Sequence, residues 1–439
     1  NQKPYLIECL TFRMRGHEEA SGTKYVPPGL FEAWQEKDPV KNYESWLIKT
    51  AVMTAEEVEV QKTTFKTHID AEIKLAVETG TMEVNTAEEL QDLYAAVPQQ
   101  NSLVINNAQP GATGEPSLST EKKFIHAISE GLKQSMEKHP NLILMGQDIA
   151  AYGGAFKVTE GFVELFGKER VRNTPLCESA IVGAALGLSL EGYKAMMEMQ
   201  FADFATVGFN QIINNLAKIH YRWGQNADVV IRMPTGGGVG AGPFHSQSNE
   251  AWFAHTPGLK VVYPSSPIDA KGLLIAAIND PNPVLYFEHK ALYRSISGAV
   301  PDEYYEIEIG KAKHVQSGQD ISVITYGAGV HWAIEYAQKN KEVSLDILDL
   351  RTLLPLDYEA IKNAVSRTGK VLILHEDNLT GGIGGEVAAW IAEHCFDKLD
   401  SPVKRCASRD TPIPFNIELE KNYMAYSRLE ESIRSLMEY

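Results

Sequence analysis

Cysteine and basic residues are both scarce in this sequence, and each shortage excludes a class of protein. No two of the four cysteines in the 439 residues are close enough to suggest a disulfide framework or a CxxC metal motif. We therefore expect reduced thiols and a cytoplasmic protein. Lysine and arginine number 41 against 57 aspartates and glutamates, a formal net charge of −16, which argues against nucleic acid as a partner because phosphate binding requires clustered basic side chains. The cysteines are Cys9, Cys177, Cys395 and Cys406.

Long apolar runs are also missing. The most apolar stretch, around residues 180–190, is shorter than the about 20 residues that span a bilayer. No signal peptide pattern is visible, so we expect no membrane partner. Hydrophobic residues make up 44% and charged residues 22% of the chain, which is the composition of an ordinary globular protein. The length predicts two to four domains.

The first part of the chain predicts a long helix followed by a linker. Thr54 and Glu57 have the spacing of a capping box, and apolar residues recur after them at a roughly helical period. Residues 95–119 are dominated by proline, glycine, asparagine and serine, which is typical of a linker. We therefore assign residues 1–80 to a first domain and 81–119 to a helix end and linker.

Beyond residue 120 the sequence predicts two α/β domains. Helical patterns alternate with short β-rich runs, which implies a mostly parallel sheet with helices on both faces. We place one domain at 120–305 and a second, smaller one at 306–439. The expected strands are LILMG at 142–146, KAMMEM at 194–199, VVIRMP at 229–234, KVVYP at 260–264, VLYFE at 284–288, ISVITYG at 321–327, VSLDILDL at 343–350 and KVLILHE at 370–376.

Glu178 is the first candidate for chemistry. It stands at the start of an almost wholly apolar helical pattern in NTPLCESAIVGAALGLSLEG at 173–192. A carboxylate there would be poorly solvated, which favours its protonated form and makes it a candidate for proton transfer. The alternative is that Glu178 interacts only with backbone N–H groups at the helix N-terminus.

Two further segments could line a site. Gln200 and Phe204 would share one face if residues 198–224 are helical, although such an aromatic is more often part of a core. Five glycines lie between residues 236 and 242, where they would let the backbone approach a ligand closely. His245 follows and could act as a general acid–base, although a lone histidine is more often structural.

A third segment lies near the start of the chain. A strand-like run over residues 4–15 leads into FRMRGHEE at 12–19. His17 follows Arg13 and Arg15 and could meet an anion. The alternative is a solvated charged turn.

Taken in order, these segments resemble the beta subunit of the thiamine diphosphate-dependent 2-oxo acid dehydrogenases, most closely the branched-chain (2-oxoisovalerate) type. The resemblance covers about residues 120–439. In addition, PYLIECLTFRMRGH, within residues 1–80, is similar to the C-terminal end of the alpha subunit, so the chain resembles an alpha–beta fusion. The beta-type motifs are NTPLCESAIVGAALG, EMQFADF, GPFHSQSNEAWFAHTPGLKVV, FEHKALYRS, LDLRTLLPLD, HEDNLTGGIGGEVAAWI and RDTPIPF.

The resemblance implies a fold and a cofactor site. It implies a thiamin diphosphate-binding α/β fold followed by a transketolase C-terminal-like α/β domain. It places Glu178 against N1′ of the cofactor's aminopyrimidine, with Phe204 stacked on the ring, Gln200 in the same pocket and Leu176 packed nearby. The cofactor supplies the carbanion chemistry, and the protein orients it.

Two histidines match the family's active-site histidines. His245 would protonate a sulfur of the lipoyl group or position the lipoyl arm, and His17 would stabilise negative charge on the reacting adduct. These two roles are partly interchangeable.

The resemblance also implies metal ions. The GDG motif and paired asparagines that bind diphosphate and Mg²⁺ in the alpha subunit are absent, so Mg²⁺ ligands are expected outside this segment, in a missing upstream part or a separate alpha chain. The family's potassium site maps to a group of residues that includes Val230. Because the Val230 side chain has no oxygen, the site is expected to be weaker or formed by backbone carbonyls. Its candidate ligands are Val229, Ala277, Asp280 and Asn282.

The expected reaction is oxidative decarboxylation of a branched-chain 2-oxo acid with reductive acylation of lipoyl groups on an acyltransferase core. The assembly would be a homodimer or a heterotetramer. A pyruvate or acetoin dehydrogenase component is the alternative within the family, because one methylene changes discrimination by only about 1–3 kcal/mol. A catalytically incomplete structural subunit and, more weakly, a transketolase-like aldehyde transfer are the alternatives outside it.

Overall fold

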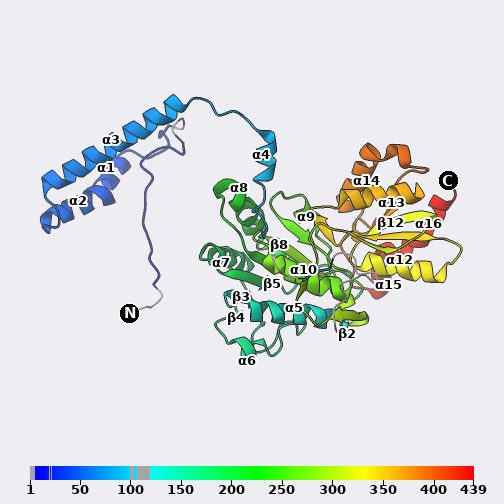
Figure 1. Ribbon diagram of the computed structural model, residues 1–439. Helices are drawn as coiled ribbons and strands as arrows, with labels where there is room; N and C mark the ends of the chain where they lie inside the picture. The colour runs from blue at the N-terminus through cyan, green and yellow to red at the C-terminus, as the bar shows by residue number, and fades with distance from the viewer. Residues whose placement is uncertain (1–4, 19, 21, 99–102, 106–118) are drawn as a thin grey trace. The chain divides into compact units, whose positions relative to one another are not determined.

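The computed structural model describes residues 5–18, 20, 22–98, 103–105 and 119–439 (Figure 1). The chain divides into two compact units, residues 1–85 and 86–439. Each is described by itself below. In the described residues, no helix combines the length and the apolar character that a bilayer crossing requires.

The 1–85 unit consists of three helices: α1 (Leu30–Gln35), α2 (Pro39–Lys49) and α3 (Ala55–Thr79). The predicted capping box is confirmed, since the Glu57 amide donates to Thr54 Oγ1 at 3.1 Å and the Thr54 amide donates to Glu57 Oε2 at 2.7 Å. The strand expected over residues 4–15 is wrong for its described part, 5–15, which contains no strand. A strand needs a paired neighbour to satisfy its backbone, and the described part of this unit offers none.

The 86–439 unit contains a seven-stranded sheet in the order β14-β7-β8-β6-β5-β3-β4. Its strand pairs are parallel except for the antiparallel pair of β14 with β7, which confirms the predicted parallel α/β fold. Its strands are β3 (Leu142–Gly146), β4 (Val171–Asn173), β5 (Lys194–Glu198), β6 (Val229–Thr235), β7 (Lys260–Val262), β8 (Val284–His289) and β14 (Thr352–Leu354).

Both faces of this sheet are buried, because alternate side chains of its strands belong to different apolar clusters. Ile143 and Met145 pack with α7 (Glu178–Leu190), whereas Leu142 and Leu144 pack with α5 (Phe124–Lys138) and α10 (Pro267–Asn279). The period-2 alternation of a strand therefore sends one set to each helical layer. Shorter helices in this part are α4 (Thr86–Gln91), α6 (Phe162–Phe166), α8 (Ile219–Trp223), α9 (Ala251–Ala254) and α11 (Leu292–Ser295).

A second sheet of five strands, in the order β11-β13-β12-β15-β16, forms the C-terminal part. One face is covered by α12 (Ala328–Lys339) and α16 (Leu429–Met437), and the other by α13 (Tyr358–Thr368) and α14 (Ile383–His394). The cluster beneath α13 and α14 is continuous with the α7 side of the first sheet. The strands are β11 (Lys313–Gln316), β12 (Ile321–Thr325), β13 (Leu345–Asp349), β15 (Val371–Asn378) and β16 (Lys404–Ser408), followed by α15 (Ile417–Tyr423).

The predicted linker is partly bound to the first sheet domain. Strand β1 (Leu103–Val104) pairs with β10 (Tyr305–Glu306), and β2 (Ser119–Lys123) pairs with β9 (Ser297–Pro301). Asn282 exchanges two hydrogen bonds with the backbone of Ala95, at 2.8 and 3.0 Å. The rest of that linker, 99–102 and 106–118, lies outside the described residues.

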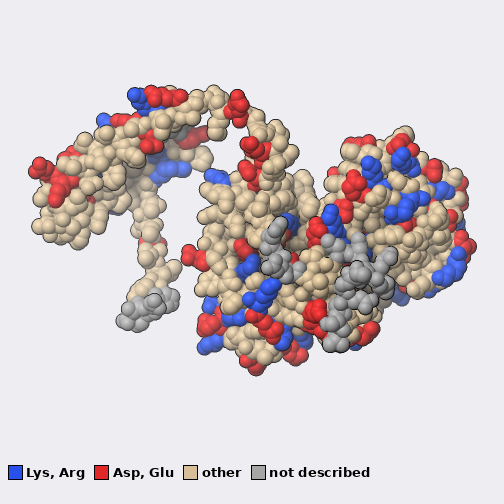
Figure 2. Space-filling view, in the orientation of Figure 1, with Lys and Arg blue, Asp and Glu red and all other residues tan. Residues whose placement is uncertain are grey.

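Charge is distributed without a single basic patch on the visible face. Figure 2 shows blue and red side chains interspersed over the 86–439 unit. This agrees with the low count of lysine and arginine in the sequence, because phosphate backbones are bound by contiguous basic surface.

Candidate functional site

Glu178 begins helix α7 next to the carboxyl ends of parallel strands, where ligands of α/β proteins bind. Its side chain is buried, with the residue 5% exposed. Oε1 accepts a hydrogen bond from Gln147 Nε2 at 3.0 Å, and Gln147 directly follows β3. No other hydrogen bond to this carboxylate occurs among the described residues, so Glu178 is a buried acid that retains capacity for a ligand.

An aromatic group stands close to the start of α7. Phe204 belongs to a short 3₁₀ helix, Ala202–Thr206. Gly208, four residues further on, packs against α7, since a Cβ built there would lie 3.6 Å from the Glu178 carbonyl oxygen. This packing brings the Phe204 segment to the Glu178 end of the helix.

His245 joins this aromatic group. Its ring lies edge-on to Phe201 and Phe204, with centroid distances of 4.7 and 5.6 Å. Phe201 also contacts Phe204 at 5.7 Å. Three rings from two separate predicted segments therefore meet at one place in the fold.

Gln200 lies beside this group but not as predicted. It precedes the 3₁₀ helix of Phe204, so the expectation that the two share a helix face is wrong. Its Nε2 donates to Asp148 Oδ2 at 3.4 Å, and Asp148 has a left-handed backbone with φ 58°. Leu176 is 79% exposed, so it presents apolar surface that the other described residues of the 86–439 unit leave open.

Two charged groups flank the aromatic rings. Asp203 is buried and accepts from the Gln247 amide at 3.3 Å, and burial raises the pKa of its carboxyl group. Lys290 Nζ lies 5.7 Å from the centre of the Phe201 ring, and burial lowers the pKa of its amine to about 8. Perturbed groups of this kind are common at functional sites.

A buried ion cluster lies in the strands beneath the site, and sequence reasoning missed it. Arg232 in β6 is fully buried between Glu198 of β5 and Glu288 of β8. Its nitrogens lie 2.5 Å from Glu198 Oε2 and 2.6 and 2.7 Å from the Glu288 oxygens. Burial, opposed by the Arg232 charge, raises the pKa of Glu198. The signal was present, because each is a charged residue inside an otherwise apolar strand.

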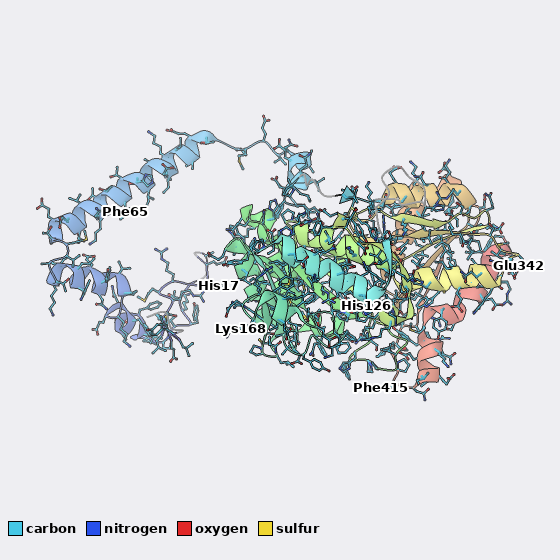
Figure 3. All side chains as sticks on the ribbon, turned by 60° about the horizontal axis from the view of Figure 1, so that its bottom comes forward. His17, Phe65, His126, Lys168, Glu342 and Phe415 are labelled. Atoms are coloured by element: carbon cyan, nitrogen blue, oxygen red, sulfur yellow. The ribbon has the colours of Figure 1, made fainter. Side chains whose placement is uncertain are left out.

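His17 belongs to a different unit of the chain from these residues. It lies in the 1–85 unit (labelled in Figure 3), where its Nδ1 is 3.3 Å from Arg13 Nη1. Glu178, Phe204 and His245 belong to the 86–439 unit. A joint role for His17 and His245 therefore stays a prediction.

The predicted potassium ligands are already engaged by protein groups. Asp280 Oδ2 lies 2.5 Å from Lys260 Nζ, and Asp280 Oδ1 accepts from Asn282. Asn282 Oδ1 accepts from the Ala95 amide. These contacts involve only the side chains of Asp280 and Asn282, and the potassium site that also includes Val229 and Ala277 stays a prediction.

The fit to the other implied groups is uneven. No cluster of three or more His, Cys, Asp or Glu side chains that could hold a metal ion occurs among the described residues. For an aminopyrimidine the donor set does fit. A buried carboxylate with unused capacity, Glu178, lies near an aromatic face, Phe204, and both suit a flat nitrogen-rich ring.

Comparison with known proteins gives three family matches. Residues 121–295 match the transketolase pyrimidine binding domain, 310–427 the transketolase C-terminal domain, and 1–85 the dehydrogenase E1 component. The E1 component match covers the helical unit, in agreement with the resemblance to an alpha–beta fusion.

Individual relatives agree with these matches. The chain is 48% identical over 322 residues to the 2-oxoisovalerate dehydrogenase subunit beta of Bacillus subtilis, covering 72% of this chain and 98% of that protein. It is 42% identical over 320 residues to the mitochondrial subunit beta 2 of that enzyme from Arabidopsis thaliana, covering 71% and 88%.

A pyruvate-type relative and a solved structure are also similar. The pyruvate dehydrogenase E1 component subunit beta of a Staphylococcus epidermidis strain is 41% identical over 296 residues, covering 66% of this chain and 91% of that protein. A solved split gene transketolase, an inactive beta4 tetramer, aligns with a TM-score of 0.60 at 21% identity over 72% of this chain and 98% of that chain. This last likeness concerns the fold alone.

Proposed function

Because this chain belongs to the family of the 2-oxo acid dehydrogenase beta subunits, we propose that its 86–439 unit provides the pyrimidine-binding half of a thiamine diphosphate site. The reaction is the oxidative decarboxylation of a 2-oxo acid. The observation that carries the proposal is the buried Glu178 carboxylate, which has one hydrogen bond, from Gln147, beside the aromatic group of Phe204.

Glu178 moves the proton on which the reaction depends. When bound, thiamine diphosphate supplies the carbanion and the electron sink. Glu178 shares a proton with N1′ of the aminopyrimidine, and burial strengthens that interaction because the surrounding dielectric is low. Gln147 fixes Oε1 of Glu178, which leaves Oε2 as the oxygen available to the ring.

His245 acts later in the reaction. Its position against Phe201 and Phe204 places an imidazole beside the same aromatic group, where it can protonate a leaving sulfur or hold the lipoyl arm. His17 belongs to the dehydrogenase E1 component segment. Its assignment to charge stabilisation rests on the resemblance alone.

The substrate we propose is a branched-chain 2-oxo acid. The relative from Bacillus subtilis is a 2-oxoisovalerate dehydrogenase subunit and is 48% identical, against 41% for the pyruvate-type relative. Pyruvate remains the competing substrate because a small difference in pocket volume changes discrimination by only about 1–3 kcal/mol.

The partners we propose follow from the incomplete site. Diphosphate and Mg²⁺ would be held by an alpha-type chain or segment, since the sequence lacks the GDG motif of the alpha subunit. A lipoyl-bearing acyltransferase would accept the acyl group. The assembly would be a homodimer of fused chains or a heterotetramer.

The first test is calorimetric titration of thiamine diphosphate with Mg²⁺ into this chain, alone and mixed with an alpha-type chain. We expect binding in the mixture and little binding to this chain alone. The mixture should then decarboxylate 3-methyl-2-oxobutanoate faster than pyruvate at equal low concentration. Absence of cofactor binding in the mixture would contradict the proposed site.

A further inference from the structure

The glycine-rich loop between β6 and His245 is held by charged side chains on its backbone. Lys290 Nζ donates to the Gly236 carbonyl at 2.5 Å. Glu376 Oε1 accepts from the Gly237 amide at 2.6 Å. Glu420 accepts from the Gly238 amide at 2.9 Å and from the Gly240 amide at 3.1 Å. Charge-assisted bonds of this kind are about twice as strong as neutral ones.

Apolar side chains press on the same loop. A Cβ at Gly237 would lie 2.4 Å from Ile413 Cδ1, and a Cβ at Gly242, whose φ is +72°, would lie 2.3 Å from Phe415 Cε1. These positions therefore require glycine. The sequence predicted that the glycines would admit a ligand, whereas at these positions the close neighbours are other residues of the chain.

Lys290 directly follows β8 of the first sheet, whereas the other residues that hold the loop come from the C-terminal sheet domain. Glu376 lies in β15, and Glu420 lies in α15. Ile413 and Phe415 lie in the connection between β16 and α15, and Phe415 is labelled in Figure 3. Both carboxylates are buried, at 5% and 3% exposure. Loss of Glu376 would leave the buried Gly237 amide without its acceptor, and loss of Glu420 would free the more exposed amides of Gly238 and Gly240.

Glu376 is itself held in the charged form. Its Oε2 lies 2.5 Å from His289 Nε2. Burial acts to raise the pKa of Glu376, but His289, the Gly237 amide and Lys290 together outweigh it and lower the pKa. The carboxylate is therefore available as a fixed acceptor for the loop.

The loop continues directly into His245. The His245 amide donates to the Gly242 carbonyl at 3.3 Å, so the position of the ring follows the position of Gly242. The ring then reaches Phe201 at 4.7 Å. A shift of the loop would displace His245 and leave Glu178, which stands on the separate helix α7, in place.

We propose that Glu376 and Glu420 are positioning residues through which the C-terminal domain fixes the loop that carries His245. This inference rests on the proposed function for its catalytic consequence, which is that transfer of the acyl group needs this grip more than decarboxylation does. The C-terminal domain thereby contributes to the active site without contacting the substrate.

The first experiment measures the loop directly, without cofactor. Amide hydrogen exchange of the peptide over residues 236–245 is compared between the full wild-type chain and the variants Glu420→Gln and Glu420→Ala. Glu418→Gln is the matched control, because Glu418 lies on the same helix, is exposed and pairs with Lys421. We expect exchange of this peptide to rise at least about tenfold in Glu420→Ala, less in Glu420→Gln, and to stay unchanged in Glu418→Gln.

The second experiment measures the two half-reactions on the assembled enzyme. Decarboxylation is followed with an artificial electron acceptor, and transfer is followed as reductive acylation of a free lipoyl domain. In Glu420→Gln we expect transfer to fall at least about tenfold and acceptor-linked decarboxylation to fall about twofold. The variant Phe415→Ala, which loosens the same loop from its apolar side, should show the same split with a smaller loss.

The outcomes separate this inference from the proposed function. If hydrogen exchange of residues 236–245 is unchanged in Glu420→Ala, the proposed positioning role is wrong. It is also wrong if Glu420→Gln and Phe415→Ala both lower the two half-reactions equally. If the wild-type assembly shows no thiamine-dependent decarboxylation, the proposed function fails, while the exchange experiment still decides whether the loop is held as described.

Discussion

Two buried glutamates in neighbouring elements, Glu178 and Glu198, have opposite surroundings. Glu198 shares Arg232 with Glu288, and the three charges lie in adjacent strands with distances of 2.5 to 2.7 Å. Glu178 is as deeply buried but accepts one hydrogen bond, from a neutral amide. Removing one member of a paired buried cluster destabilises the fold, because the remaining buried charge is left without a partner. A sparsely satisfied one is available to a ligand, so the comparison separates a structural acid from a functional one.

The largest expected effect is at Glu178. The variant Glu178→Gln should lower decarboxylation about a thousandfold, because the amide cannot relay a proton. Its thermal midpoint should stay close to that of the wild type, since no buried charge pair is broken. The control is Glu191→Gln at the exposed end of the same helix, which should keep its activity. Near-normal turnover of Glu178→Gln would refute its role.

At the buried ion cluster of Glu198, Arg232 and Glu288 we expect a loss of stability. Arg232→Met should lower the free energy of unfolding by about 3–5 kcal/mol, because two buried carboxylates lose their cation. Urea unfolding followed by circular dichroism measures this change. Arg222→Met serves as control, since Arg222 lies at an exposed helix end. If Arg232→Met is as stable as the wild type, the cluster does not support the sheet.

A smaller effect sharpens the comparison at His245. In His245→Ala we expect reductive acylation of a lipoyl domain to fall about a hundredfold, and acceptor-linked decarboxylation to fall by clearly less, because a general acid contributes about this much to a transfer step. The two assays are run on the same preparation. Equal losses would mean that His245 serves the decarboxylation step as well.

The smallest effect concerns Asp377, a buried acid that is neither paired with a cation, as Glu198 is, nor as sparsely hydrogen-bonded as Glu178. Burial raises the pKa of Asp377 to about 7, with Glu376 and Asp410 adding to the shift, and Glu250 faces it as a further acid. Because the folded state holds a proton that the unfolded state releases near pH 4, this group lowers stability as the pH rises from about 4 to about 7.

The variant Asp377→Asn should remove that loss. We expect its gain in unfolding free energy over the wild type to be about 2.5 kcal/mol larger at pH 8 than at pH 5. Urea unfolding at the two pH values measures it, with Asp397→Asn, an exposed acid, as the control. A gain that is the same at both values would show that Asp377 is charged throughout.

Much of the fold was predictable from local pattern. Most strands of the two sheets, but not β4, β11, β14 and β16, coincide with the predicted β-rich runs, and α7 coincides with an apolar run, so the α/β class and the family could be recognised from the sequence. Glu178 was found because it is the acid at the start of an apolar helical run, and His245 was found because it follows a glycine-rich segment. These signals are local, and periodicity reports them well.

The remaining contacts depend on residues far apart in the chain. The Glu420 contact to Gly238 joins residues separated by 182 positions, and no periodicity encodes such a pair. The role of Gln147 could not be predicted from the sequence, because a single glutamine after a strand is common and indicates no partner. Arg232 and its two acids could have been found, since three charges in three apolar strands require one another. The expected strand at 4–15 failed because a strand needs a neighbour.

Strand β14 comes from the second half of the 86–439 unit but completes the edge of the first sheet by pairing with β7. It ends at Leu354, whereas β8, beside β7 in the same sheet, ends at His289. While the chain emerges from the ribosome, the β7 edge therefore stays unpaired until about residue 354 has appeared, and open edges of this kind attract other chains. Cutting the gene at residue 306 would likewise separate a strand from its sheet. A gene fragment that ends there would encode the first sheet with the edge of β7 unpaired.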